Sequence, residues 1–227
     1  MVTGKVKVQV IDNKYQVISR ADDEMKDSGV EWLGKIPKEW EVKRLKRIVD
    51  LRNNKGVYIS NQNYIALENI ESKTGKYIEN SKEEIIVDGI CNIFFENDVL
   101  FGKLRPYLAK CIITSNKGFC SSELLVMEPI SIKSKLLKYI ILNDKFIQLV
   151  DSSTYGAKMP RASWNFIGEI LISYPHSHEQ QLIVDFLDEK TAKIDSTIEK
   201  INLQIEKLKG AKQSLISEAV TGKIEVL

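Results

Sequence analysis

The middle of the chain alternates short apolar runs with polar residues that favour turns. Asn, Gly, Asp and Ser separate these runs, and each run has the length of a strand. The pattern therefore predicts a series of short strands joined by turns. The runs read NYIALENI, EEIIVDG, CNIFFENDVLF, KCIITS and CSSELLVMEPI.

The stretches on either side of these strands have different patterns. Apolar residues at spacings of three and four predict a helix over SKLLKYIILNDKFIQLV, which ends at Val150. Upstream, Trp32, Ile36 and Trp40 are expected apolar anchors where the globular part opens, and Pro37 breaks the chain between them. Residues 1–30 are charged and poor in apolar side chains, so we expect an extended lead-in there.

The last part of the chain has the pattern of one long helix. Ser177 and Gln180 form a capping-box signature after Pro175, and the helix predicted to start there is about 60 Å long by Ser217. Apolar residues recur along it at intervals of three, four or seven, as in a coiled coil. A helix of this length needs a second long helix as partner, from another copy or another protein. The predicted interface residues, the heptad seam, are Leu187, Ile194, Ile198, Ile201, Ile205, Leu208 and Leu215.

Strands followed by a long helix predict an α+β fold, with a small mixed β-sheet in a globular domain and one long C-terminal coiled-coil helix. The expected organisation is a lead-in at 1–30, a globular domain at 31–175, a helix at 176–218 and a tail at 219–227. The first twenty residues contain no signal-peptide run, and no stretch approaches the roughly 18 apolar residues of a membrane span. We therefore expect a cytoplasmic chain.

The charge of the chain is uneven, although the formal net charge is only +2. Between Val99 and Ser122 the sequence has four basic residues and no Asp or Glu. Such a local excess is typical of a surface that binds phosphates. A solvated surface with scattered lysines is the alternative interpretation.

The sequence lacks the common catalytic and metal-binding patterns. Cys91, Cys111 and Cys120 are odd in number, have no CxxC spacing and lie among strand-like residues, so we expect buried thiols. His176 and His178 have no accompanying cysteine or acidic cluster and are expected to be loop residues, with no metal bound. No GxGxxG, GxSxG or complete phosphate-binding loop is present. These observations favour a binding protein over an enzyme.

Four stretches of the chain form a pattern together: SGVEWLGKIPKEWEVKRLK, DVLFGKLRPYLAKCII with GFCSSELLVM, STYGAKMPRASWNFIGEILI, and the long segment from EQQLIVDFLDEK to AVTGKIEV. In their order and spacing they resemble one known family, the specificity subunits of type I restriction-modification enzymes. The resemblance covers nearly the whole chain. Subunits of this family carry two target-recognition domains, each followed by a long helix, and the helices pair antiparallel.

The resemblance implies a half-length form with one target-recognition domain, which pairs with a second copy of itself as a homodimer and reads a bipartite target. Its implied partners are double-stranded DNA, a methyltransferase (modification) subunit and a restriction subunit. It implies no cofactor in this chain, with S-adenosylmethionine, ATP and Mg used by the other subunits. An RNA-binding or other nucleic-acid module, or a protein-binding adaptor with a coiled coil, is the alternative function.

DNA recognition requires basic side chains for phosphates and hydrogen-bonding side chains for base edges. Two loops marked by Gly and Pro, GKLRPYLAK and TYGAKMPR, supply both kinds. A purely structural role in shaping the turns is the alternative for the first loop. The candidate DNA-binding residues are Lys103, Arg105, Tyr107, Lys110, Tyr155, Lys158 and Arg161.

The phrase VTGKVKV at residues 2–8 is nearly repeated as VTGKIEV at residues 220–226. Within the resemblance, VTGK belongs to the tail that follows a recognition-domain helix. We therefore expect residues 2–8 to be the tail of a preceding unit, as would result from truncation, a natural half-length subunit or a recombination cassette.

Overall fold

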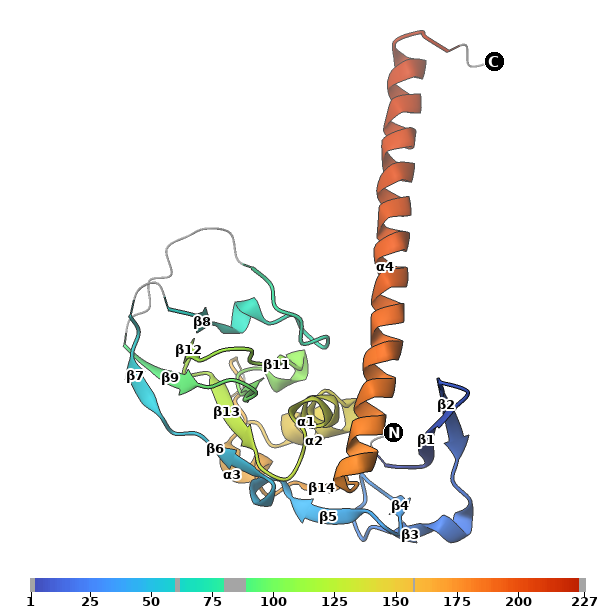
Figure 1. Ribbon diagram of the computed structural model, residues 1–227. Coiled ribbons are helices and arrows are strands. Elements are labelled where there is room, and N and C mark those ends of the chain that lie inside the picture. Colours follow the sequence, from blue (N-terminus) through green and yellow to red (C-terminus); the bar gives the residue numbers. More distant parts are fainter. Residues whose placement is uncertain (1–2, 60–61, 80–88, 157, 225–227) are drawn as a thin grey trace. The chain divides into compact units, whose positions relative to one another are not determined.

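The computed structural model describes residues 3–59, 62–79, 89–156 and 158–224. The chain forms two compact units, Met1–Val184 and Asp185–Leu227. The predicted α+β class is confirmed, since short strands and helices make up the first unit and a long helix makes up most of the second (Figure 1).

Two four-stranded sheets form the centre of the first unit. All neighbouring strands of the first sheet are antiparallel, whereas in the second sheet β12 runs parallel to β8, so this sheet is mixed. The first sheet has the order β11 (Cys111–Ile113), β10 (Val99–Gly102), β13 (Leu124–Pro129) and β6 (Val49–Leu51). The second has the order β7 (Lys55–Val57), β9 (Ile90–Phe94), β12 (Gly118–Cys120) and β8 (Tyr64–Ile65).

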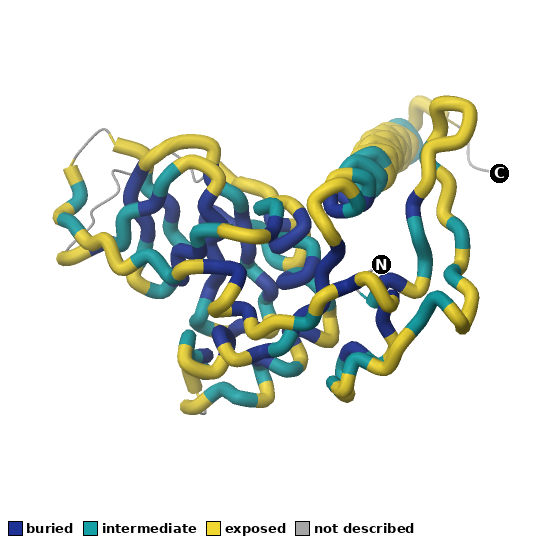
Figure 2. The backbone as a smooth tube through the Cα atoms, turned by 60° about the horizontal axis from the view of Figure 1, so that its bottom comes forward, coloured by how far each residue is buried: buried dark blue, intermediate teal, exposed yellow. Residues whose placement is uncertain are grey.

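The two sheets share one apolar core. Its buried cluster joins Leu100 and Val126 of the first sheet to Phe94 and Cys120 of the second. Buried positions gather in these strands and in the short helices (Figure 2). The strands therefore form where the apolar runs predicted them, except that EEIIVDG lies outside the described residues apart from Gly89.

The predicted lead-in contains more structure than an extended segment. Strands β1 (Val6–Ile11) and β2 (Lys14–Ser19) form a hairpin, because Asp12 and Asn13 both have positive φ, as a two-residue type I′ turn requires. A 3₁₀ turn at Asp22–Glu24 follows the hairpin. After it come two further pairs: β3 (Met25–Asp27) with β4 (Lys35–Pro37), and β5 (Glu41–Arg44) with β14 (Leu171–Tyr174).

Polar contacts attach the start of the chain to the rest of the first unit. Arg20 donates from Nε to the carbonyl of Gly4 at 3.0 Å and forms an ion pair with Glu179. Trp40 donates to the same carboxylate at 3.0 Å, and Trp40 and Ile36 are buried, as expected of anchors. The lead-in is thus fixed through Arg20 and Glu179.

The helix expected to end at Val150 is two helices, α1 (Ser134–Ile141) and α2 (Asp144–Ser152). The single-helix prediction was wrong because Asn143 adopts an extended conformation and its side chain accepts a hydrogen bond from the Lys145 amide. Asn is a favoured N-cap, and it starts a new helix here. A short helix, α3 (Trp164–Ile167), and 3₁₀ turns at Leu45–Arg47, Leu67–Asn69 and Pro106–Leu108 complete the helical elements of the described residues.

The long helix α4 spans Ser177–Val220, which confirms the predicted start. The side-chain amide of Gln180 connects the helix to the preceding segments: it accepts from the Lys133 N–H at 2.9 Å and donates to the carbonyls of Ser131 and Pro175. At the other end Gly222 has a φ of +67°, and the Lys223 amide bonds to the carbonyl of Glu218. This is the geometry of a Schellman cap.

Candidate functional site

The two loops predicted to bind DNA lie side by side, although about fifty residues separate them in the sequence. The Arg105 amide donates to the carbonyl of Pro160 at 2.8 Å, and the Ala162 amide donates to the carbonyl of Lys103 at 2.9 Å. Leu104 and Arg161 form a bridge between the loops. The fold therefore joins the two predicted segments into one surface.

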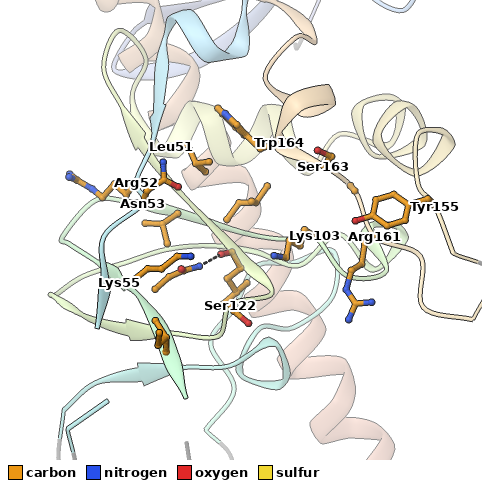
Figure 3. A pocket seen from close by; sticks show the side chains of 16 residues that line it. Leu51, Arg52, Asn53, Lys55, Lys103, Ser122, Tyr155, Arg161, Ser163 and Trp164 are labelled. Carbon is orange, nitrogen blue, oxygen red and sulfur yellow. Dashed lines mark hydrogen bonds between the residues drawn. The ribbon is translucent and has the colours of Figure 1, made fainter. Parts of the chain in front are cut away.

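A cleft of about 440 Å³ opens beside this surface, along the ends of the two sheets. In Figure 3, Asn53 and Lys55 come from one side of it, and Tyr155 and Arg161 come from the other. The polar and basic lining residues are Arg52, Asn53, Lys55, Asn92, Lys103, Ser122, Tyr155, Arg161, Ser163 and Trp164.

The charge of the cleft is positive. Four basic residues and no acidic one occur among the described residues that line it. Arg52 is engaged by Asp98 and Glu128, at 2.8 Å each. In contrast, Lys55 and Lys103 have no ion pair within the described part of the chain. Among the described residues, therefore, no carboxylate is paired with the positive charge of these two lysines.

Asp98 is the buried group that holds Arg52. Its carboxylate accepts from Arg52 Nε and from the Phe95 amide at 2.8 Å. Burial raises the pKa of Asp98 above its ordinary value, although both hydrogen bonds act in the opposite direction. The guanidinium also lies 4.8 Å from the centre of the Phe95 ring, so Arg52 is fixed against the protein.

The seven predicted DNA-binding residues fall into three groups. Lys103, Tyr155 and Arg161 line the cleft. Three others are exposed and lie in the same two loops: Arg105, Tyr107 and Lys158. The backbone of Arg105 is left-handed, with a φ of 50°. Lys110 is different, because its ammonium donates to the carbonyl of Leu67 at 2.7 Å, which gives it a structural contact.

Sequence reasoning missed the other side of the cleft. Asn53 and Lys55 are exposed. Asn53 precedes β7, and Lys55 is its first residue. Asn92 lies on β9 and donates to the carbonyl of Leu124 at 2.9 Å. The polar run RNNKG at residues 52–56, between two apolar segments, was the available signal. It has no Pro and only one Gly, so it was not recognised as a binding loop.

The cysteines are free and buried, as predicted. Burial raises the pKa of Cys111 and of Cys120 to about 12, so both remain uncharged thiols at neutral pH. His176 and His178 are exposed. His176 precedes α4, as expected of a loop residue, but the loop prediction was wrong for His178, which lies in the first turn of α4. Within the described ranges, no group of three or more His, Cys, Asp or Glu is placed to hold a metal ion, and no helix is long and apolar enough to cross a membrane.

The second unit presents an apolar seam instead of a core. Six of the seven predicted seam residues are exposed: Ile194, Ile198, Ile201, Ile205, Leu208 and Leu215. Leu187 is partly buried. None of the described residues from Asp185 onward is fully buried (Figure 2). The seam is therefore available to a partner.

A positively charged cleft on a small α+β domain is a feature that many nucleic-acid-binding proteins have. The sequence profile of the type I restriction modification DNA specificity domain matches residues 37–207. The chain belongs to this family of specificity subunits, which are distinct from the catalytic subunits of type I systems.

Curated relatives agree with this assignment. The chain is similar to the specificity subunit of the type I restriction enzyme EcoDI from Escherichia coli, with 25% identity over 85% of this chain and 44% of that protein. It is also similar to the MjaVIII specificity subunit from Methanocaldococcus jannaschii, with 23% identity over 86% of this chain and 48% of that protein. The chain thus spans about half the length of the curated relatives it matches.

A solved structure from work on complex assembly and conformational transition of the type I R-M system shares the fold. It aligns with a TM-score of 0.61 at 14% identity, over 87% of this chain and 49% of that chain.

Proposed function

We propose that this chain recognises DNA as a specificity subunit that pairs with a second copy of itself and reads one half of a bipartite target with each copy. The observation that carries the proposal is the cleft, whose lining includes Lys55 and Lys103 but no acidic residue among the described positions. Duplex DNA is a polyanion, and its affinity for proteins depends mainly on such cations.

The heptad seam supports pairing between long helices. Exposed isoleucines at this spacing favour burial against a second helix, and each buried side chain contributes roughly 1.5–3 kcal/mol. Lys212 occupies a seam position, four residues after Leu208 and three before Leu215. A parallel pair would place two Lys212 ammonium groups at the same level, whereas an antiparallel pair separates them. We therefore infer an antiparallel homodimer.

An antiparallel dimer determines the form of the target. A two-fold axis relates the two recognition domains, so the two half-sites have the same sequence in opposite orientation. A helix from Ser177 to Val220 is about 66 Å long at about 1.5 Å per residue. The half-sites are therefore separated by several base pairs that the protein does not read.

The chain itself contributes recognition and no catalysis in this proposal. A methyltransferase (modification) subunit modifies the target, and a restriction subunit cuts unmodified DNA. S-adenosylmethionine, ATP and Mg act on those other subunits.

Methylome sequencing tests this function directly. The chain is expressed as the only specificity subunit together with a cognate modification subunit, and methylated sites are compared with those in cells that lack the chain. We expect an interrupted palindrome. A methylated target with two different halves would show that the chain works beside a second, different half, and the absence of chain-dependent methylation would refute the proposed function.

A change in helix length tests the spacing. Deletion of residues 194–200 removes one heptad, shortens the helix by about 10 Å and keeps the seam in phase. This corresponds to about three base pairs at about 3.4 Å each. We expect the unread gap to change by about that number or binding to be lost, and duplication of the same heptad to act in the opposite direction. An unchanged gap in both variants would contradict the role of α4 as a spacer.

A further inference from the structure

Arg161 is held through both its main chain and its side chain. Its main-chain amide donates to the carbonyl of Tyr155 at 3.1 Å, and the Tyr155 amide donates back to its carbonyl at 3.3 Å. Its side chain binds Glu123 through Nε and Nη2 at 3.2–3.3 Å. The guanidinium therefore has a defined position on the cleft lining before any ligand binds.

The geometry of the pair leaves one edge of the guanidinium free for a ligand. Glu123 occupies the edge formed by Nε and Nη2. Nη1 and the second N–H of Nη2 form the end of the group, and no described residue is bonded to that end. Two parallel N–H donors of this kind match the O6 and N7 acceptors of guanine in the major groove.

The pair is poorly suited to a contact with phosphate. Arg161 and Glu123 together have no net charge, so their attraction for the DNA backbone is small. Lys158 is exposed in the same loop as Arg161, and Lys103 has no carboxylate partner within the described residues. These lysines are better placed to neutralise phosphates, because their charge is not compensated.

We propose that Arg161 is a specificity-determining residue that reads a guanine in each half-site, and that Glu123 is the positioning residue that aims it. The inference rests on the proposed function, since it assigns a role within the DNA-binding cleft. A role in base recognition can be distinguished from a purely structural role of the Arg161–Glu123 pair by one measurement. Loss of the two parallel N–H donors of Arg161 should relax the choice of base at a single position and leave the rest of the target unchanged.

Selection of bound duplexes from a random pool, followed by sequencing, measures this choice. The full chain is compared with Arg161→Lys, which keeps the charge but loses the planar fork, and with Glu123→Gln, which keeps the shape but weakens the positioning bond. We expect one G·C pair in each half-site of the wild-type motif to lose at least about tenfold of its preference in Arg161→Lys. Glu123→Gln should show a smaller loss at the same position.

Arg44→Lys is the matched control, because Arg44 is also ion-paired, with Glu169 at 3.1 Å, but does not line the cleft. The control should keep the full motif. A motif unchanged in both Arg161→Lys and Glu123→Gln would overturn the inference, as would a uniform loss of affinity for all sequences. If the wild-type chain selects no motif at all, the proposed function itself fails, and this inference fails with it.

Discussion

The two units of the chain use the same apolar residue types in opposite ways. In the first unit Phe101, Leu100 and Ile140 are fully buried or nearly so. In the second unit Ile194 and Leu208 are 57% and 69% exposed. The first unit thus buries many of its apolar side chains in a core of its own, whereas none of the described residues of the second unit is fully buried.

The largest expected effect is on the oligomeric state, from substitutions in the heptad seam of the second unit. Ile198→Asp combined with Ile205→Asp places four charges in a dimer interface, where each lost apolar side chain costs roughly 1.5–3 kcal/mol. We expect monomers by light scattering, while the circular dichroism of the first unit is unchanged. Lys200→Asp with Lys207→Asp has the same spacing on another face of the helix and should leave the dimer intact. A dimer that survives in the seam variant would show that the interface is elsewhere.

A core substitution should affect the first unit alone. Phe101→Ala removes a fully buried ring from β10 and should lower the free energy of unfolding by about 3–5 kcal/mol. The exposed Phe166 is the control, and Phe166→Ala should cost much less. Chemical denaturation followed by tryptophan fluorescence measures both, because Trp32 and Trp40 lie in the first unit. Equal destabilisation by the two variants would contradict the assigned core.

The smallest expected effect is a difference in salt dependence between DNA binding by the first unit and dimerisation through the second. Removal of one phosphate contact by Lys103→Ala should lower the slope of log affinity against log salt by about 0.9, while dimerisation through the apolar seam stays nearly independent of salt. The same is expected for Lys55→Ala. Lys110→Ala loses the bond to the carbonyl of Leu67 and should reduce thermal stability without changing the slope. A full change of slope in Lys110→Ala alone would reverse these assignments.

The two copies of VTGK in the sequence can be compared at their glycines. Gly4 and Gly222 have φ values of +64° and +67°, a left-handed conformation that glycine adopts without strain. A Cβ atom at Gly4 would lie 2.4 Å from Cγ of Pro37, whereas nothing lies within 4 Å of one at Gly222. The two glycines therefore share a left-handed φ but differ in their surroundings.

Local patterns in the sequence were sufficient to predict several elements. The spacing of Ile198, Ile201 and Ile205 predicted a long helix and its exposed seam, because periodicity along a helix is a property of neighbouring residues. The strands β10 and β13 were predicted from their apolar runs for the same reason. The break at Asn143 was missed because apolar spacing continues across it, and only its hydrogen bond to the Lys145 amide shows that a cap interrupts the helix.

The sequence by itself determined the fold class, the family resemblance and the chemistry of the loops, since these depend on residue types and on spacing along the chain. Only the tertiary structure decided which residues share the cleft. Lys55, Lys103 and Arg161 come from three distant segments, and long-range strand pairing and loop contacts place them together. The partners of each cation were decided in the same way: Glu123 holds Arg161 and the carbonyl of Leu67 holds Lys110, because hydrogen bonds depend on distances in space that spacing along the chain does not specify.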